Sequence, residues 1–238
     1  MLPGFSLVIP AFNEAHRVGQ TLVDALAYLR ATSPESEMVV VDDGSSDATA
    51  ELVREVFKNE GGIETRLIEQ AQNRGKGAAV RVGLLAATRP VALFSDADLS
   101  TPMEEAPKLL EPIFAREVDI AFGSRALNRR LIGHRQAWHR EQGGRIYNLL
   151  VRFATGLPYW DTQCGFKAFR LDVVRPLLEH ARSDGFGFDV ELLYLAQQAG
   201  LRMREVAVRW NHCEGSKMHL LRDSAEMLQE MIALRLRN

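Results

Sequence analysis

The sequence predicts an α/β protein in which helices cover both faces of a mostly parallel sheet. Two observations support this prediction. The chain has 238 residues, of which 46% are hydrophobic and 25% charged, so it can bury a sizeable core. Short apolar runs also alternate with helical patterns through the first half of the chain, which is typical of parallel strands connected by helices.

Five short apolar runs in the first half predict buried strands. These strands are expected at Ser6–Ile9, Glu37–Val41, Thr65–Ile68, Val91–Ser95 and Val118–Phe122. Apolar residues at helical spacing follow the first three runs and predict helices over 22–29, 52–56 and 79–84, with Asp47 as the N-cap of the second. Thr101-Pro102 predicts the start of a fourth helix, because proline is favoured at the first helical position.

The second half of the chain has a less regular pattern. Helices are expected at 147–154, 173–181, 190–199 and 220–236, and strands near 165–169 and 206–210. The sequence contains no internal repeat, low-complexity tract or long linker. We therefore expect one domain spanning residues 1–238.

Composition argues against several classes of protein. The net charge of −2 disfavours a nucleic-acid binder with a basic surface. No apolar stretch approaches the roughly 18 to 20 residues that span a bilayer, and the first residues lack the basic region of a secretory signal. Cys164 and Cys213 are far apart and form no zinc-binding pattern. We expect a cytoplasmic protein with reduced cysteines and no transmembrane helix.

Positive charge is concentrated in residues 125–152. Seven arginines and a single acid, Glu141, give this segment a charge of +6, so an anionic group is expected to dock there. The alternative is that several of these arginines pair with acids elsewhere or lie on a solvated helix face. Trp138, Phe153 and Trp160 could contact lipid, but aromatic residues at such spacing are more often part of a core.

Polar clusters follow three of the predicted strands directly, at 10–14, 42–47 and 96–98. Open parallel sheets bind ligands outside the carboxyl ends of their strands, so these clusters are expected to share one edge. Asp96 and Asp98 could both turn toward one hard cation. Mg²⁺ and Mn²⁺ suit such a pair, because they take one or two carboxylates and complete their shell with water and phosphate oxygens.

Each cluster taken alone also has an ordinary structural interpretation. Asp96 and Asp98 could cap a helix, Glu14 could begin one, and Asp43-Gly44 is a common turn. Residues 73–77 have the composition of a phosphate loop but lack the spacing of a P-loop, and no GxGxxG occurs. Asp189 and Glu191 would point to different sides of a helix or strand, so a capping role for Asp189 is as well supported as one near a substrate.

In combination, the motifs resemble those of family-2 glycosyltransferases of the GT-A type. This resemblance is carried by Pro10–Glu14, Val41–Asp47, Asn73–Gly77, Asp96–Asp98 and Gly123–Arg125. The second half is similar to the dolichyl-phosphate β-glucosyltransferases, and more broadly to polyprenyl-phosphate hexosyltransferases, at Asp161–Lys167, Phe188–Leu193 and Glu214–Lys217. The resemblance covers nearly the whole chain and implies a single, Rossmann-like GT-A domain.

The resemblance also implies an activity. It indicates metal-dependent transfer of a hexose, first of all glucose, from a nucleotide sugar to a polyprenyl or dolichyl phosphate, with inversion in one displacement. UDP-glucose is the first expected donor and GDP-mannose the second. Residues 1–124 would bind the nucleotide and 125–238 the acceptor, with the protein peripheral at the inner face of the membrane.

Roles for individual residues follow from motif position in the same resemblance. It implies nucleotide-binding roles for Pro10, Phe12, Glu14, Val41, Asp43, Lys76 and Ala97. Asp96 and Asp98 would hold Mg²⁺ or Mn²⁺. The acceptor phosphate would contact Arg125, Arg129, Ser216 and Lys217. Catalytic roles are implied for Asp96, Asp98, Arg125 and Asp189.

Two other functions compete with this interpretation. Asp96 could be the nucleophile and Asp98 the general acid of a haloacid-dehalogenase-like phosphohydrolase, but such a motif would lie nearer the chain start and would leave residues 10–14 and 41–47 unexplained. A nucleotide-sensing protein without turnover is the other candidate. The intact acidic and basic positions weigh against it.

Overall fold

A seven-stranded sheet forms the centre of the protein. The computed structural model describes residues 1–133 and 138–213, and its strands follow the order β3-β2-β1-β4-β6-β5-β7. Strand β6 runs antiparallel to β4 and β5, whereas the other pairings are parallel. The strands are β1 (Ser6–Ala11), β2 (Glu37–Asp42), β3 (Glu64–Glu69), β4 (Val91–Ser95), β5 (Ile120–Ser124), β6 (Phe166–Arg170) and β7 (Met203–Ala207).

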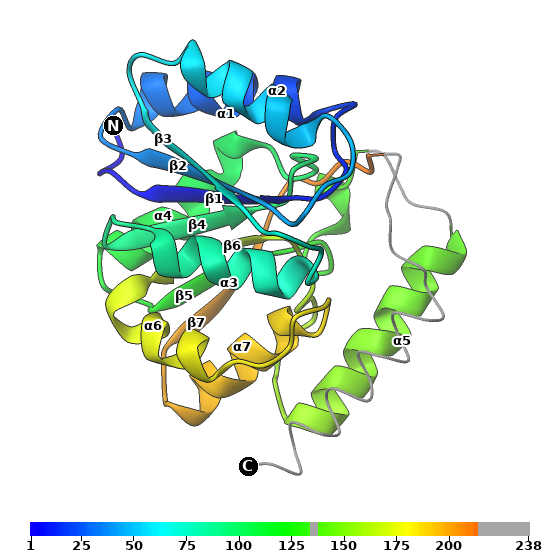
Figure 1. The fold of residues 1–238 in the computed structure, drawn as a ribbon. Coiled ribbons are helices and arrows are strands. Elements are labelled where there is room, and N and C mark those ends of the chain that lie inside the picture. Colours follow the sequence, from blue (N-terminus) through cyan, green and yellow to red (C-terminus); the bar gives the residue numbers. More distant parts are fainter. Residues whose placement is uncertain (134–137, 214–238) are drawn as a thin grey trace.

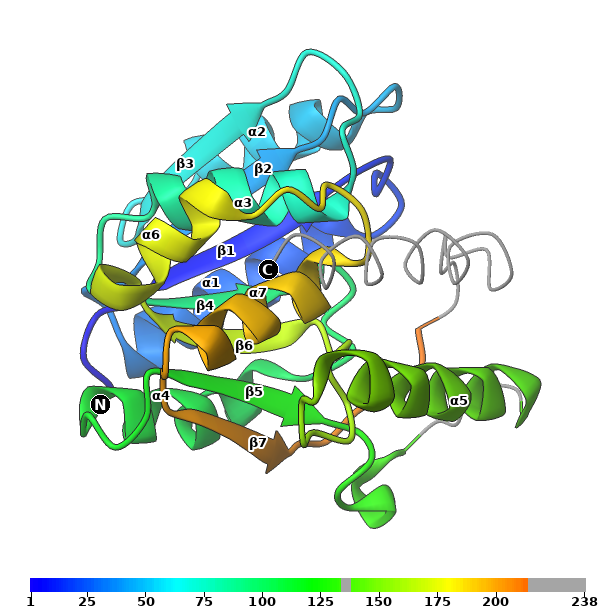
Figure 2. The same cartoon turned by 90° about the horizontal axis from the view of Figure 1, so that it is seen from below.

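Helices cover both faces of this sheet, which confirms the predicted architecture (Figure 1). On one face lie α1 (Val18–Thr32), α2 (Thr49–Lys58) and α4 (Ala106–Phe114). On the other lie α3 (Lys76–Ala86), α6 (Leu171–His180) and α7 (Phe188–Gln198). Helix α5 (Trp138–Thr155) lies at the edge toward which the arrow of β5 points, and it extends beyond the sheet (Figure 2).

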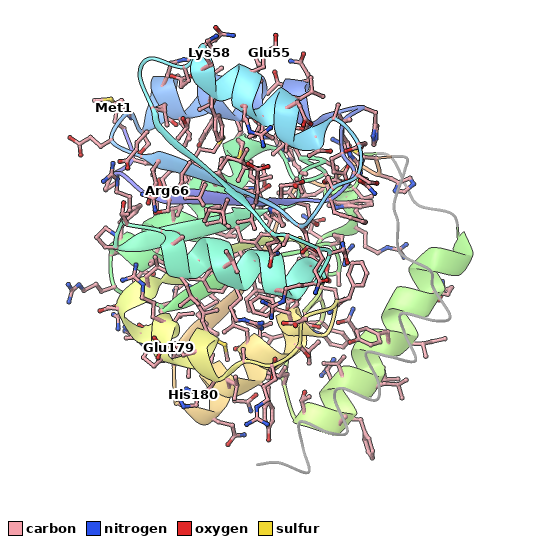
Figure 3. The ribbon with its side chains drawn as sticks, viewed as in Figure 1. Met1, Glu55, Lys58, Arg66, Glu179 and His180 are labelled. Atoms are coloured by element: carbon pink, nitrogen blue, oxygen red, sulfur yellow. The ribbon has the colours of Figure 1, made fainter. Side chains whose placement is uncertain are left out.

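Alternation along the strands divides the core into two layers. In β1, Leu7 and Ile9 pack on the side of α1, whereas Val8 packs on the side of α3. All three side chains are fully buried. The outer helices are amphipathic, and Glu55 and Lys58 project from the exposed side of α2 (Figure 3). Burial on both sides explains why β1, β2 and β4 appear in the sequence as continuous apolar runs. The prediction that the third strand is buried is wrong, because β3 lies at the edge of the sheet and is only partly buried.

Two predicted element boundaries are wrong. The last strand spans 203–207 instead of 206–210, because its parallel pairing with β5 begins at Ile120↔Met203 and ends at Ser124↔Ala207. The fourth helix does not start at Pro102. That residue is extended, with a ψ of 149°, and precedes a 3₁₀ turn over Met103–Glu105, after which α4 begins at Ala106.

Two further predictions concern helix α2 and the C-terminal segment. Ala48, and not Asp47, occupies the N-cap of α2, although the Asp47 carboxylate still accepts the backbone N–H of Thr49 at 3.0 Å. The predicted helix over 220–236 lies outside the described residues. Within 1–133 and 138–213, we find no helix that is both long and apolar enough to cross a bilayer.

The reversal of β6 determines which residues meet at the carboxyl edge of the sheet. Strands β1, β2, β4 and β5 end at this edge, whereas β6 begins there. Residues that follow the four parallel strands therefore lie near those that precede β6. This is where the candidate site forms.

Candidate functional site

Asp96 lies directly over the backbone that precedes β6. Its N–H donates to the carbonyl of Gly165 at 3.0 Å. A Cβ atom on Gly165 would come within 1.8 Å of Asp96 Oδ2 and 2.2 Å of its Cγ. Glycine at position 165 therefore makes the room that the Asp96 carboxylate occupies.

Lys76, at the first position of α3, neutralises this carboxylate. Its Nζ lies 2.7 Å from Asp96 Oδ1 and 5.3 Å from the centre of the Phe94 ring. Burial raises the pKa of Asp96, the Lys76 charge opposes that rise, and the nearby Asp98 adds to it. Burial would lower the pKa of Lys76, but the negative charges of Asp96 and Asp189 more than compensate, so this pKa is raised. The site thus contains a charged pair that is still partly open to solvent.

Asp98 is held in the turn that follows β4. One of its carboxylate oxygens accepts the N–H of Ser100 at 2.9 Å. The preceding residue, Ala97, is buried in the core, and its carbonyl accepts the Thr21 hydroxyl at 2.7 Å. The turn places both acidic residues at the carboxyl edge, as predicted, while Ala97 packs inward. The predicted contact between Ala97 and a nucleotide stays a prediction.

The loops after β1 and β2 are joined to each other. The Asn13 N–H donates to Ser45 Oγ at 2.8 Å, and the Ser46 N–H donates to Asn13 Oδ1 at the same distance. Asn13 has a φ of 51°, a left-handed conformation that asparagine tolerates better than most residues. Glu14 donates its N–H to Thr49 Oγ1 at 2.7 Å and accepts from the Arg17 guanidinium. Residues 42–49 therefore hold the turn that brings Phe12 and Glu14 to the edge of the sheet.

Pro10 and Val41 lie within this part of the sheet. They are register partners in the parallel pair of β1 and β2, and both are buried. Their predicted nucleotide contacts are untested.

Asp43 anchors the loop that carries Lys76. Its carboxylate accepts the Gln70 amide at 2.7 Å and the backbone N–H groups of Arg74 and Gly75 at 2.9 and 2.8 Å. Burial raises the pKa of Asp43, and the two backbone donors limit the rise. This anchoring role was not visible in the sequence. The predicted contact with a nucleoside stays a prediction, at a carboxylate that already accepts three hydrogen bonds.

A second loop, residues 183–187, and the first residue of α7 pack against the Lys76 loop. The Ala78 N–H donates to the Asp184 carbonyl at 3.1 Å, and the Asp184 carboxylate pairs with Arg81. A Cβ on Gly77 would lie 2.5 Å from Phe188 Cβ. The two glycines in Gly75-Lys76-Gly77 permit this close approach, which the sequence analysis did not predict.

Arg125, which follows β5, is engaged by Asp161. Its Nε and Nη2 donate to the two carboxylate oxygens at 2.7 and 2.8 Å, and its backbone N–H donates at 2.9 Å. Burial disfavours the Arg125 charge, but the adjacent Asp161 outweighs that effect and raises its pKa. Two of the Arg125 guanidinium donors, Nε and Nη2, are therefore already bonded to Asp161, although Arg125 was expected to bind a phosphate. Sequence analysis did not identify Asp161 as the partner.

Asp189 forms a buried ion pair below the site. Lys167 Nζ lies 2.6 Å from Asp189 Oδ1 and also donates to the Cys164 carbonyl at 2.6 Å. Glu191 points elsewhere and accepts the N–H groups of Arg182 and Ser183. The two acids are therefore not a pair, as expected. Asp189 here contacts Lys167 of β6, the strand that Gly165 precedes, and its predicted catalytic role is untested.

The remaining predicted residues are more dispersed. Arg129 begins an exposed 3₁₀ turn over Arg129–Leu131, while Ser216 and Lys217 lie outside the described residues. Cys164 and Cys213 are free thiols, and burial raises the pKa of Cys164 to about 11. In the described ranges, no three or more His, Cys, Asp or Glu side chains gather into a metal-binding cluster.

The fold is that of the GT-A glycosyltransferases. Glucosyl-3-phosphoglycerate synthase from Mycobacterium tuberculosis, solved with phosphoglyceric acid, superposes with a TM-score of 0.68 at 20% identity, covering 98% of this chain and 79% of that one. The same synthase has been crystallised with Mn²⁺ and UDP-glucose, and that structure gives a TM-score of 0.66.

The family is shown by sequence. Residues 6–178 match glycosyl transferase family 2, and the chain belongs to this family. It is 40% identical to dolichyl-phosphate beta-glucosyltransferase of Drosophila melanogaster over 90% of this chain and 68% of that protein, and 33% identical to the Homo sapiens protein over 98% and 75%. The predicted family is confirmed, and the protein is a glycosyltransferase. The phosphohydrolase alternative loses its support.

Proposed function

We propose that this protein transfers glucose from UDP-glucose to dolichyl or a related polyprenyl phosphate at a membrane surface. The observation that supports this most directly is the 40% identity to a dolichyl-phosphate beta-glucosyltransferase across 90% of the chain. The paired Lys76 and Asp96 at the carboxyl edge add a charged site suited to a diphosphate. GDP-mannose is the second candidate donor.

The site residues fit a divalent cation of the donor diphosphate. The Asp96 carboxylate fits beside Gly165, which carries no side chain, and stays partly exposed, and Asp98 follows it in the same turn. Mg²⁺ and Mn²⁺ take one or two protein carboxylates and fill their shell with phosphate and water. When bound there, the ion supplies positive charge to the diphosphate that departs.

The transfer needs no strong base from the protein. A lipid monophosphate has a second pKa near ~6, so it is mostly dianionic at neutral pH. One of its oxygens attacks the anomeric carbon, the bond from that carbon to the UDP oxygen breaks, and the electron pair leaves with UDP. One such displacement inverts the anomeric configuration.

The chain's own contribution is alignment and charge. Lys76 places a cation 2.7 Å from Asp96, beside the position proposed for the diphosphate. Arg125 is held by Asp161, so its remaining donors have a fixed direction. Asp189 forms an ion pair with Lys167. This agrees with a reaction in which Asp189 does not act as a general base.

A donor panel tests this proposal. The protein is incubated with radiolabelled UDP-glucose, UDP-galactose or GDP-mannose, a short polyprenyl phosphate and Mg²⁺ or Mn²⁺, and the lipid is then extracted. We expect label in the lipid from UDP-glucose, and loss of that label with a chelator. Label from GDP-mannose alone would select the second donor. Release of free sugar without labelled lipid would contradict a lipid-phosphate acceptor.

A further inference from the structure

Helix α5 is apolar on two opposite sides. Tyr147 and Val151 face inward and are buried in the core layer that contains α3, α6 and α7. The outward side carries four large hydrophobic residues. Their exposed fractions are 61% for Ile146, 64% for Leu149, 43% for Leu150 and 86% for Phe153.

These four residues form one stripe. Their spacing of three, one and three positions places them on the same side of a helix. The helix lies at the carboxyl edge and extends past the sheet (Figures 1 and 2), and the exposed fractions show that the stripe faces solvent. A surface helix normally presents polar residues on its outer side. An apolar stripe there indicates a surface that binds something apolar.

A tryptophan and an arginine lie beside the stripe. Trp160 is 56% exposed, and the Arg152 guanidinium lies over its ring at 3.9 Å from the centroid. The prediction that Phe153 and Trp160 are more often core is therefore wrong, because both side chains reach solvent. Tryptophan is enriched at the boundary between lipid and water, where its ring is amphipathic. Arginine beside it favours anionic headgroups.

We propose that the α5 stripe, defined as Ile146, Leu149, Leu150 and Phe153, inserts into the interfacial layer of an anionic lipid bilayer. A helix that presents an apolar stripe to solvent next to basic residues is typical of helices that lie in this layer. Arg125 is paired with Asp161, but residues 126–152 still carry six arginines and one acid in the sequence, a charge of +5, and Arg130 is exposed and precedes α5 in the chain. This charge favours a lipid surface over a second copy of the chain, which would bring like charges together.

The stripe is connected to the candidate site. Asn148, on the same helix, accepts the N–H and the hydroxyl of Thr162, both at 3.1 Å. Thr162 follows Asp161, which holds Arg125. Insertion of α5 would therefore hold the Arg125 edge next to the headgroups, where a lipid phosphate lies. This inference rests on the proposed function for its acceptor, but the insertion itself does not require turnover.

Vesicle binding tests the inference. Leu149→Ser and Phe153→Ser proteins are sedimented with vesicles of phosphatidylcholine and phosphatidylserine in equal parts. Each substitution is expected to lower the partition coefficient about tenfold, because a large apolar side chain no longer leaves water. Val23→Ser on α1 is the matched control, since Val23 is 47% exposed on a different helix. This control is expected to bind vesicles as the unchanged protein does.

Two further measurements separate the possible failures. UDP-glucose affinity by calorimetry and the melting temperature are expected to stay unchanged in both stripe variants. Unchanged vesicle binding in Leu149→Ser and Phe153→Ser would overturn the inference. The inference would also be overturned if the unchanged protein sediments as a dimer, both variants sediment as monomers, and lipid does not alter either result.

The inference and the proposed function can also fail separately. If vesicles bind through the stripe but no polyprenyl phosphate is glucosylated, the proposed function fails and the insertion stands. If the protein transfers glucose in detergent but does not bind vesicles, the insertion fails and the proposed function stands.

Discussion

Replacing Gly165 by alanine tests how tightly the geometry of Asp96 is set. The added Cβ would lie 1.8 Å from Asp96 Oδ2, whereas ordinary contact begins at 3.4 Å. The Asp96 carboxylate must therefore move by about 1.6 Å or rotate away. Either response breaks its 2.7 Å contact with Lys76 and displaces an oxygen proposed to hold the metal.

The expected effect is large for turnover and small for stability. A misplacement of about 1 Å at a reacting centre can cost roughly 100-fold in rate, equivalent to about 2.7 kcal/mol in the activation barrier. Asp96 is partly exposed, so its carboxylate can move into solvent without opening a cavity in the core. We therefore expect kcat for glucose transfer to fall at least 100-fold, with a melting temperature close to that of the unchanged protein.

The assay is glucose transfer to a short polyprenyl phosphate, followed over a range of Mn²⁺ concentrations. Gly19→Ala on α1 is the matched control, because nothing lies within 4 Å of a Cβ added there. This control is expected to keep full activity. If Gly165→Ala transfers glucose within about threefold of the unchanged protein, Asp96 is not held in the position that the reaction needs.

Three further outcomes are expected. Asp98→Asn keeps an oxygen that can accept the Ser100 N–H at 2.9 Å but loses the charge, so turnover falls more than about 100-fold while the fold persists; full activity at limiting Mn²⁺ would contradict a metal role. Asp43→Ala removes the carboxylate that accepts three hydrogen bonds, so both the melting temperature and the UDP affinity decrease. An unchanged UDP affinity in calorimetry would show that the loop held by Asp43 does not contribute to nucleotide binding. Asp119→Asn lowers the free energy of unfolding by about 2 kcal/mol at pH 7. Burial raises the pKa of Asp119, but the hydrogen bonds from Arg202 outweigh this effect, so the pKa in the folded protein is lowered. The stabilisation is therefore present above the unfolded pKa of about 4 and is lost as the pH falls through the folded pKa. If the difference in unfolding free energy between Asp119→Asn and the unchanged protein does not narrow between pH 5 and pH 2, this sign is refuted.

The sequence predicted the parts of the fold that depend on local pattern. Apolar runs identified β1, β2, β3 and β4 to within two residues. Strands β1, β2 and β4 are buried on both faces and leave a continuous signal, whereas β3 at the edge of the sheet is only partly buried. The polar clusters at 10–14, 42–47 and 96–98 were expected at one edge and lie there, because parallel strands all end on the same side of a sheet. Both inferences use only the direction of the chain and the side-chain period.

The pairings within the site could not be predicted in the same way. Asp161 begins a motif that carries the family resemblance and Asp184 belongs to none, but only the fold brings these two acids to Arg125 and Arg81. The buried pair of Lys167 and Asp189 is 22 positions apart in the chain. No periodicity connects such residues, because their contact depends on how β6 and α7 meet. The α5 stripe was missed for a different reason, since an apolar residue in a helix looks the same whether it faces the core or solvent.

The direction of β6 links these observations. A strand of five residues carries no sign of its orientation, so the sequence predicted a strand here but not its reversal. A parallel β6 would place Cys164 and Gly165 at the opposite edge, far from Asp96. Because β6 runs against β4, its first residues meet the last residues of that strand at Ser95↔Phe166. The Asp96 N–H can then bond to Gly165, and Lys167 can reach both the Cys164 carbonyl and Asp189. The reversed strand β6 thus places Gly165 against the Asp96 carboxylate and buries Lys167 next to Asp189.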